Sequence, residues 1–253
     1  MIRSTAAARP LLLLDFDGTV CTGDDPVLAY AAAAADLVGE RLPEVGATAG
    51  RELHHQLESY LSGHPEAPRY ADGYAAVAHI AARLAPGSSD DVLERAYASS
   101  RAALAAGRLE VEVPPGLVDL LRGLAGRVDR VLVTNAPRTG VDEALVALGL
   151  TDVLDEVVTS AGKPAGWDAL LPRLLGGRPA ASALSVGDVW ANDLAAPLRA
   201  GCSTALVDRF GHAAGPAHLT APDLPGLYAG ITTWAEDPAA FQGAHPLAVT
   251  SSA

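Results

Sequence analysis

Two aspartates stand together at the end of an apolar run near the start of the chain. Leu11 to Leu14 are followed by Asp15, Phe16 and Asp17. Residues two positions apart on an extended backbone point the same way, so both carboxylates are expected side by side. Two adjacent carboxylates repel each other, and a hard cation such as Mg²⁺, which prefers oxygen ligands, would offset that cost. The simpler alternative is a strand end with solvated acids, because Asp-Gly pairs are common in turns.

Further residues whose side chains could take part in binding or catalysis follow three later segments of the chain. These residues are Thr134 and Asn135 after Val131–Val133, Lys163 after Glu156–Thr159, and Asp188 and Asp193 after Ala183–Val186. Lys163 is the only lysine in the sequence, whereas arginine is used everywhere else. A lone compact ammonium, which the planar fork of arginine does not reproduce, indicates a function at this position. The alternative is the chance survival of one surface lysine.

These stretches, taken in order, resemble the four motifs of the haloacid dehalogenase-like hydrolase superfamily. The stretch Asp15-Phe16-Asp17-Gly18-Thr19 resembles the first motif, and Val131–Asn135 resembles the second. Lys163 resembles the third motif, and Gly187–Asp193 resembles the fourth. The resemblance extends from about Pro10 to Val207 and leaves the C-terminal tail unexplained. It implies an α/β, Rossmann-like core with a doubly wound parallel sheet and an inserted α-helical cap domain.

The resemblance also implies an activity, the hydrolysis of a small-molecule phosphomonoester. Asp15 would be the nucleophile that forms an aspartyl-phosphate, and Asp17 would protonate the leaving oxygen and later activate water. The Thr134 hydroxyl and the backbone N–H of Asn135 would bind the phosphoryl oxygens. Lys163 would add a positive charge next to Asp15 and the phosphate.

A magnesium site is implied at the same place. The cation would be held by Asp15, by the backbone carbonyl of Asp17 and by Asp188. Asp193 would act from outside this ligand set and orient either Lys163 or a metal-bound water. The alternative for Asp188 and Asp193 is helix N-capping, because Asp is common just before helices.

The superfamily also includes dehalogenases, phosphonate hydrolases and phosphomutases. Dehalogenases lack the second aspartate of the first motif and use no Mg²⁺, so Asp17 argues against that activity. Phosphonate hydrolases need a lysine in the cap, and the predicted cap has none. A phosphomutase acting on a sugar phosphate stays open, because it shares the nucleophile, the acid and the metal. A non-catalytic phospholigand-binding module is the remaining alternative, and it would be expected to lack at least one motif residue.

The elements that would position these residues can be predicted from hydrophobic patterns. The Leu11–Leu14 run is too short for a membrane helix and fits a central strand covered on both faces. Segments 1–21 and 110–240, in which strands and helices alternate, predict the parallel-sheet core. Residues 22–109 show four helical patterns and no strand pattern, which predicts the cap. Residues 241–253 are expected to be a disordered tail.

Composition limits the partners and the compartment. A formal net charge of −12 disfavours nucleic acid as a partner. No apolar run is long enough to span a membrane, and no signal-peptide core precedes Asp15. Cys21 and Cys202 are too few for a disulfide framework, which suits a reducing cytoplasm. The expected partner is therefore a small phosphorylated molecule in the cytoplasm, and the oligomeric state is left open.

Overall fold

The computed structural model describes residues 8–41, 43–86 and 90–247, and it divides into two compact units. The first, here called the sheet unit, comprises the described parts of Met1–Val20, Val113–Ala136 and Gly149–Ala253. The second, here called the helical unit, comprises the described parts of Cys21–Glu112 and Pro137–Leu148. Each unit is described by itself.

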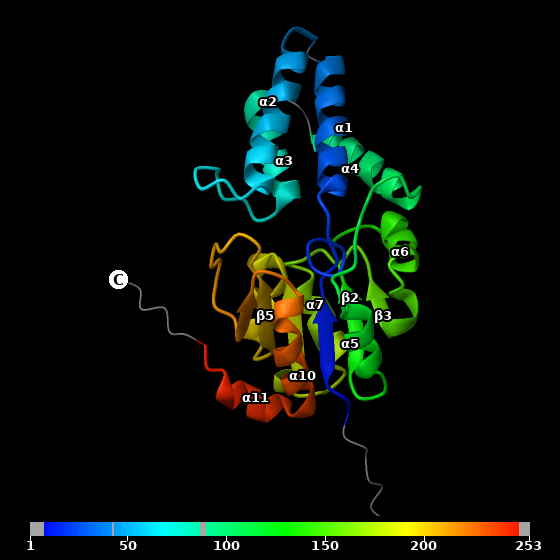
Figure 1. Cartoon of the computed structure of the whole chain (residues 1–253), viewed down its shortest axis with the longest axis vertical. Coiled ribbons are helices and arrows are strands. Elements are labelled where there is room, and N and C mark those ends of the chain that lie inside the picture. Colours follow the sequence, from blue (N-terminus) through cyan, green and yellow to red (C-terminus); the bar gives the residue numbers. More distant parts are fainter. Residues whose placement is uncertain (1–7, 42, 87–89, 248–253) are drawn as a thin grey trace, which may run out of the picture. The chain divides into compact units, whose positions relative to one another are not determined.

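The sheet unit is built on one parallel sheet of six strands (Figure 1). The strands are β1 (Leu11–Leu14), β2 (Asp129–Val133), β3 (Glu156–Val158), β4 (Ala183–Gly187), β5 (Ser203–Val207) and β6 (Leu219–Ala221), in the order β3-β2-β1-β4-β5-β6. β1 is central, because it pairs with β2 on one side and with β4 on the other. This topology confirms the predicted doubly wound parallel sheet. It also brings the carboxyl ends of β1, β2 and β4 to one edge.

Helices cover both faces of this sheet. They are α5 (Leu117–Gly123), α7 (Trp167–Leu175), α8 (Trp190–Asp193), α9 (Ala195–Arg199), α10 (Tyr228–Glu236) and α11 (Pro238–Ala244). Leu11 and Leu13 pack against Trp167, Leu171 and Leu174 of α7 in one hydrophobic core. The other two leucines of β1 point to the opposite face, where Figure 1 shows α5 and α10. The wholly buried β1 therefore matches the wholly apolar run that predicted it.

The helical unit contains the four helices that the patterns in residues 22–109 predict. They are α1 (Asp25–Arg41), α2 (Pro43–Leu61), α3 (Gly73–Leu84) and α4 (Asp90–Ala105). A fifth helix, α6 (Arg138–Ala147), packs on α4 and belongs to the same unit. The structure therefore differs from the predicted division, which assigned all of 110–240 to the core. The reason is that α6 buries its apolar side against α4, a contact between distant segments that no local pattern records.

The C-terminal segment also differs from the prediction of a disordered tail over 241–253. Pro238–Ala244 forms α11, with Asp237 as the N-cap that accepts a hydrogen bond from the backbone N–H of Ala240 at 3.0 Å. Phe241 is only 1% exposed, and its ring stacks on His245 with 4.2 Å between centroids. Burial of this aromatic ring gives the segment its order. Residues 248–253 of the predicted tail lie outside the described residues.

Two further expectations concern the membrane and the cysteines. Across the described residues, the longest and most apolar helices still fall short of what crossing a bilayer requires. Cys21 and Cys202 are both buried free thiols, as the absence of a disulfide framework predicts.

Candidate active site

The first aspartate leaves β1 directly into the site. The backbone N–H of Asp15 continues the sheet by donating to the carbonyl of Val186 in β4 at 3.0 Å. This bond fixes the residue at the carboxyl end of the two neighbouring strands. Asp15 is 9% exposed, so its carboxylate has little contact with solvent.

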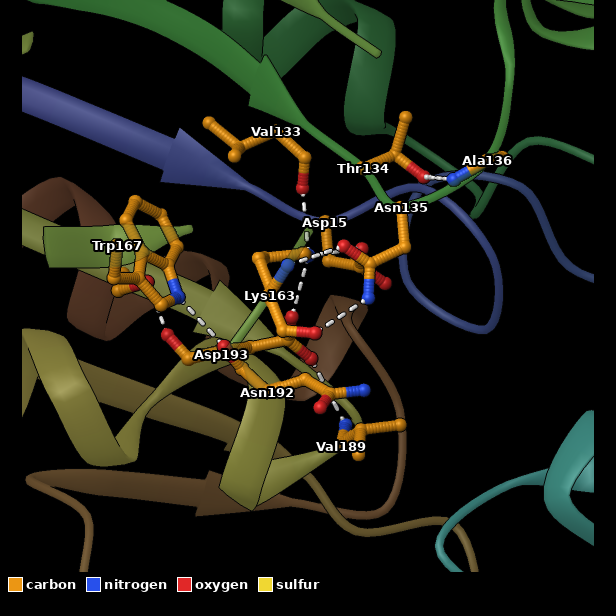
Figure 2. Close-up of polar contacts among 11 residues, drawn as sticks. Asp15, Val133, Thr134, Asn135, Ala136, Lys163, Trp167, Val189, Asn192 and Asp193 are labelled. Carbon is orange, nitrogen blue, oxygen red and sulfur yellow. Dashed lines mark hydrogen bonds and ion pairs between the residues drawn. The ribbon is translucent and has the colours of Figure 1, made fainter. Parts of the chain in front are cut away.

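The ammonium of Lys163 lies beside this carboxylate and joins three segments. Its Nζ donates to Asp15 Oδ1 at 2.7 Å, to Asp193 Oδ1 at 2.6 Å and to the carbonyl of Val133 at 2.7 Å (Figure 2). Burial alone would lower the pKa of Lys163, but the charges of Asp15 and Asp193 and their hydrogen bonds outweigh it and raise the pKa above its ordinary value. An ammonium has three N–H donors, and protein oxygens accept all three. Lys163 is therefore a fixed positive charge at the site.

Asp193 is held in place from several directions. Its Oδ2 accepts from the backbone N–H of Val189 at 3.0 Å, and its backbone carbonyl accepts from Ser185 Oγ at 2.7 Å. A Cβ atom on Gly187 would lie 2.4 Å from the Asp193 side chain, so only glycine lets the carboxylate fold back over the strand end. Burial, and then the charge of Asp15, raise the pKa of Asp193, while Lys163 opposes this shift. Asp193 thus contacts the Lys163 ammonium directly, and an orienting role toward either this lysine or a metal-bound water stays a prediction.

The end of β2 supplies a hydroxyl and an amide. The Thr134 hydroxyl is buried, and its oxygen accepts from the backbone N–H of Ala136 at 3.0 Å, which leaves its own proton to be donated. The side chain of Asn135 is turned toward Lys163 and makes two hydrogen bonds with its backbone (Figure 2). The sequence predicts only a role for the backbone N–H of Asn135, so this use of the side chain is new.

Three carboxylates could hold a cation. One ligand oxygen from each of Asp15, Asp188 and Asp193 lies within 4.8 Å of the others. Oxygen donors of this kind suit Mg²⁺. Gly18 has a φ of +77°, and a Cβ there would lie 2.2 Å from Asp188 Oδ2, so the first-motif loop and the Asp188 carboxylate approach closely. The donor set fits a magnesium ion, and the half-buried Asp17 side chain is not one of the three carboxylates.

Two contributions to the site are not predicted from the sequence. The carbonyl of Val133, at the last position of β2, accepts one of the three ammonium bonds. Trp167 donates from Nε1 to the carbonyl of Asn192 at 2.6 Å and thereby ties α7 to the segment that carries Asp193. Backbone acceptors and packing of this kind leave no signal in a single sequence.

Comparisons with known proteins agree on the fold. Residues 10–201 match the family model described as haloacid dehalogenase-like hydrolase. A search of curated proteins finds no sequence that matches the chain. Among solved structures, a protein described as a predicted phosphoglycolate phosphatase from Haemophilus somnus 129PT has a TM-score of 0.61 at 18% identity, covering 88% of this chain and 98% of its own.

Two other solved structures are similar over almost their full lengths. The HAD-hydrolase YfnB of Bacillus subtilis, in a form bound to magnesium, has a TM-score of 0.55 at 17% identity, covering 88% of this chain and 99% of its own. A 2-haloacid dehalogenase from Pseudomonas syringae pv. tomato DC3000 has a TM-score of 0.52 at 20% identity, covering 90% and 100%. Phosphatases and dehalogenases thus share this architecture, and the likeness shows the fold.

The family model spans most of the chain and includes every residue placed in the site above. The order of the motifs, the parallel sheet and the gathered carboxylates all agree with it. This chain belongs to the haloacid dehalogenase-like hydrolases.

Proposed function

We propose that this protein is a magnesium-dependent phosphatase that hydrolyses a small phosphomonoester through an aspartyl-phosphate. The observation that carries the proposal is the arrangement of acids around one ammonium. Asp15, Asp188 and Asp193 gather their oxygens within 4.8 Å, and Lys163 donates to two of them. Asp17, the acid that a phosphatase needs and a dehalogenase lacks, follows two positions after the nucleophile.

The first step transfers the phosphoryl group to the protein. Lys163 donates to Asp15 Oδ1, so we assign the attack on phosphorus to Oδ2. The new bond joins Oδ2 to phosphorus while the bond from phosphorus to the ester oxygen breaks. Asp17 gives its proton to that departing oxygen, so the product leaves as a neutral alcohol.

The second step returns the protein to its starting state. Asp17, now ionised, takes a proton from water, whose oxygen bonds to phosphorus as the bond to Asp15 breaks and inorganic phosphate forms. The Thr134 hydroxyl and the backbone N–H of Asn135 bind the phosphoryl oxygens in both steps. Bound Mg²⁺, held by Asp15, Asp188 and the Asp17 carbonyl, would supply positive charge that offsets the charge on the transferring group.

The helical unit is proposed to serve as the cap that the resemblance implies. A cap of this kind excludes bulk water and large substrates. Small diffusible phosphate esters in the cytoplasm are therefore the expected substrates, in preference to phosphoproteins. The identity of the alcohol depends on side chains of this unit.

The experiment measures phosphate release from p-nitrophenyl phosphate with Mg²⁺ and after chelation with EDTA. Wild type is expected to be active only with the metal, and Asp15→Asn to be inactive because an amide is not a nucleophile. Asp168→Asn, an exposed change in α7, is the matched control and should leave activity unchanged. Chloride release from 2-chloropropionate without metal would overturn the proposal in favour of a dehalogenase.

A phosphomutase is the second outcome that the assay must separate. It would interconvert sugar phosphates and retain the phosphoryl group, so little orthophosphate would appear. Incubation with a sugar 1-phosphate, followed by separate quantification of orthophosphate and sugar 6-phosphate, distinguishes the two. Binding of phosphate esters with neither reaction would identify a non-catalytic module.

A further inference from the structure

The Asn135 side chain pairs with both polar groups of the Lys163 backbone. Asn135 Nδ2 donates to the Lys163 carbonyl at 2.9 Å, and the Lys163 N–H donates to Asn135 Oδ1 at 2.6 Å (Figure 2). A primary amide carries a donor and an acceptor side by side, so it can satisfy one residue's backbone as a neighbouring strand would. We refer to these two bonds as the Asn135–Lys163 amide pair.

We propose that Asn135 is a positioning residue, whose carboxamide fixes the lysine that supports the nucleophile. The expected effect on catalysis rests on the proposed function, whereas the contact between Asn135 and Lys163 does not depend on it. It assigns to the side chain a role separate from phosphate binding by the backbone N–H of the same residue.

The surroundings explain why Lys163 needs this support. Lys163 lies outside any helix or strand, so its buried backbone groups require partners from elsewhere. The loops after β2 and β3 are already joined by two bonds, from Ser160 N–H to the Ala136 carbonyl and from Ala161 N–H to the Thr134 carbonyl, each at 2.9 Å. The amide pair extends this series to Lys163.

The amide pair fixes one end of a flexible side chain, and the ammonium bonds fix the other. Four rotatable bonds separate the Lys163 backbone from Nζ, and ordering them costs entropy. The backbone is held by Asn135, while Nζ is held by Asp15, Asp193 and the Val133 carbonyl. Loss of the first support lets the backbone of Lys163 shift, which misplaces the charge beside Asp15.

The competing role is direct contact between the Asn135 side chain and substrate, because Nδ2 has a second N–H. The two roles predict different kinetics for Asn135→Ala. A positioning role predicts that kcat falls about 10- to 100-fold while KM changes little, since the backbone N–H that binds phosphate remains. A direct contact predicts a raised KM and weaker inhibition by orthophosphate.

A second readout does not depend on activity, because Lys163 is the only lysine in the chain. Protein without tag lysines, labelled with ¹⁵N-lysine, gives one backbone amide signal, which belongs to Lys163. In wild type, this amide is expected to resonate downfield and to exchange slowly with solvent. In Asn135→Ala, it should move upfield and exchange about tenfold faster.

Two more variants complete the experiment. Asn135→Asp keeps the acceptor for the Lys163 N–H but replaces the donor to its carbonyl, so the amide should stay downfield while kcat still falls. Asp168→Ala, an exposed truncation on α7, controls for nonspecific loosening and should change neither readout.

An unchanged Lys163 amide in folded Asn135→Ala would overturn the proposal. A wild-type protein without phosphatase activity would refute the proposed function, yet the amide signal would still report on the contact.

Discussion

At the scale of single residues, the site is notable for how completely Lys163 is used. Protein oxygens accept hydrogen bonds from all three of its ammonium N–H groups. In the proposed reaction, Lys163 therefore acts on the substrate through its positive charge and not through a hydrogen bond. A compact ammonium can meet three oxygens from three directions, which a planar guanidinium cannot do. This geometry gives a physical reason for one lysine in a chain that otherwise uses arginine.

A prediction at this scale concerns the acid. Asp17→Asn removes the proton donor for the leaving group but keeps the size of the side chain. Poor leaving groups need this proton most, so turnover of an alkyl phosphate should fall about 10²- to 10⁴-fold, and turnover of p-nitrophenyl phosphate should fall much less. Steady-state kinetics with both substrates provide the measurement. Equal losses on both would contradict the acid role of Asp17.

The second prediction at this scale concerns the metal. Cation binding between Asp15 and Asp188 should stabilise the folded protein by mass action, by about 2.7 kcal/mol at a hundredfold excess over Kd. Mg²⁺ should therefore raise the Tm of wild type in thermal unfolding and should leave the Tm of Asp188→Asn nearly unchanged. Asp168→Asn, an exposed change in α7, should respond like wild type. The same rise in Tm for Asp188→Asn would remove Asp188 from the metal site.

At the scale of elements, a buried arginine joins a strand, a turn and a helix. Arg130 is the second residue of β2, and its guanidinium makes two bonds to Asp155, each at 2.9 Å, and one to the Leu121 carbonyl at 2.8 Å. The hydrogen bond from Arg130 holds the pKa of Asp155 below its ordinary value. This bidentate pair connects β2, the turn before β3 and the end of α5.

Removal of the carboxylate should therefore destabilise the sheet unit. Asp155→Asn leaves the Arg130 guanidinium without its counterion, and we expect a loss of about 2 kcal/mol, less than for a fully buried pair because Asp155 is partly exposed. Urea unfolding at pH 7 gives the measurement. Asp142→Asn breaks the exposed Arg138–Asp142 pair and serves as the control, with a change below about 0.5 kcal/mol.

The pH dependence of the same pair follows from the direction of the pKa shift. The folded-state pKa of Asp155 lies below the unfolded value of 3.8, so its stabilisation is complete above that value. The stabilisation is lost as the pH falls through the folded-state pKa. The difference between wild type and Asp155→Asn should thus be constant near neutral pH and shrink below about pH 4. A difference that persists unchanged in acid would show that Asp155 acts through packing.

At the scale of the whole molecule, the sequence predicts the site better than the boundaries around it. Asp15 and Asp188 are predicted because each follows an apolar strand and matches a motif, and parallel strands share one carboxyl edge. Lys163 is predicted because it matches a motif and is the only lysine in the sequence. β6 is not predicted, because it has three residues and lies at the edge. The packing of α6 and the side-chain role of Asn135 depend on contacts between distant segments, which periodicity does not encode.

The C-terminal helix provides a prediction at this scale. The sequence predicts disorder over residues 241–253, whereas Phe241 is buried and lies within α11. Phe241→Ala should destabilise the protein by about 3 kcal/mol, the range for a buried aromatic residue. Chemical unfolding measures this loss, with Val146→Ala, at an exposed position, as a near-neutral control. A loss below about 0.5 kcal/mol would show that the helix contributes little.

The order of the strands also has a consequence for synthesis on the ribosome. β1 is made before the other strands of the sheet, yet it pairs only with β2 and β4, and Asp15 and Lys163 are 148 residues apart in sequence. Helices α1–α4 follow β1 and fold from local contacts, while non-local pairing is slow. The four leucines of β1 therefore lack both of their partner strands until β2 and β4 have been synthesised. Nascent chains of this protein are expected to bind chaperones through this segment until β4 is complete.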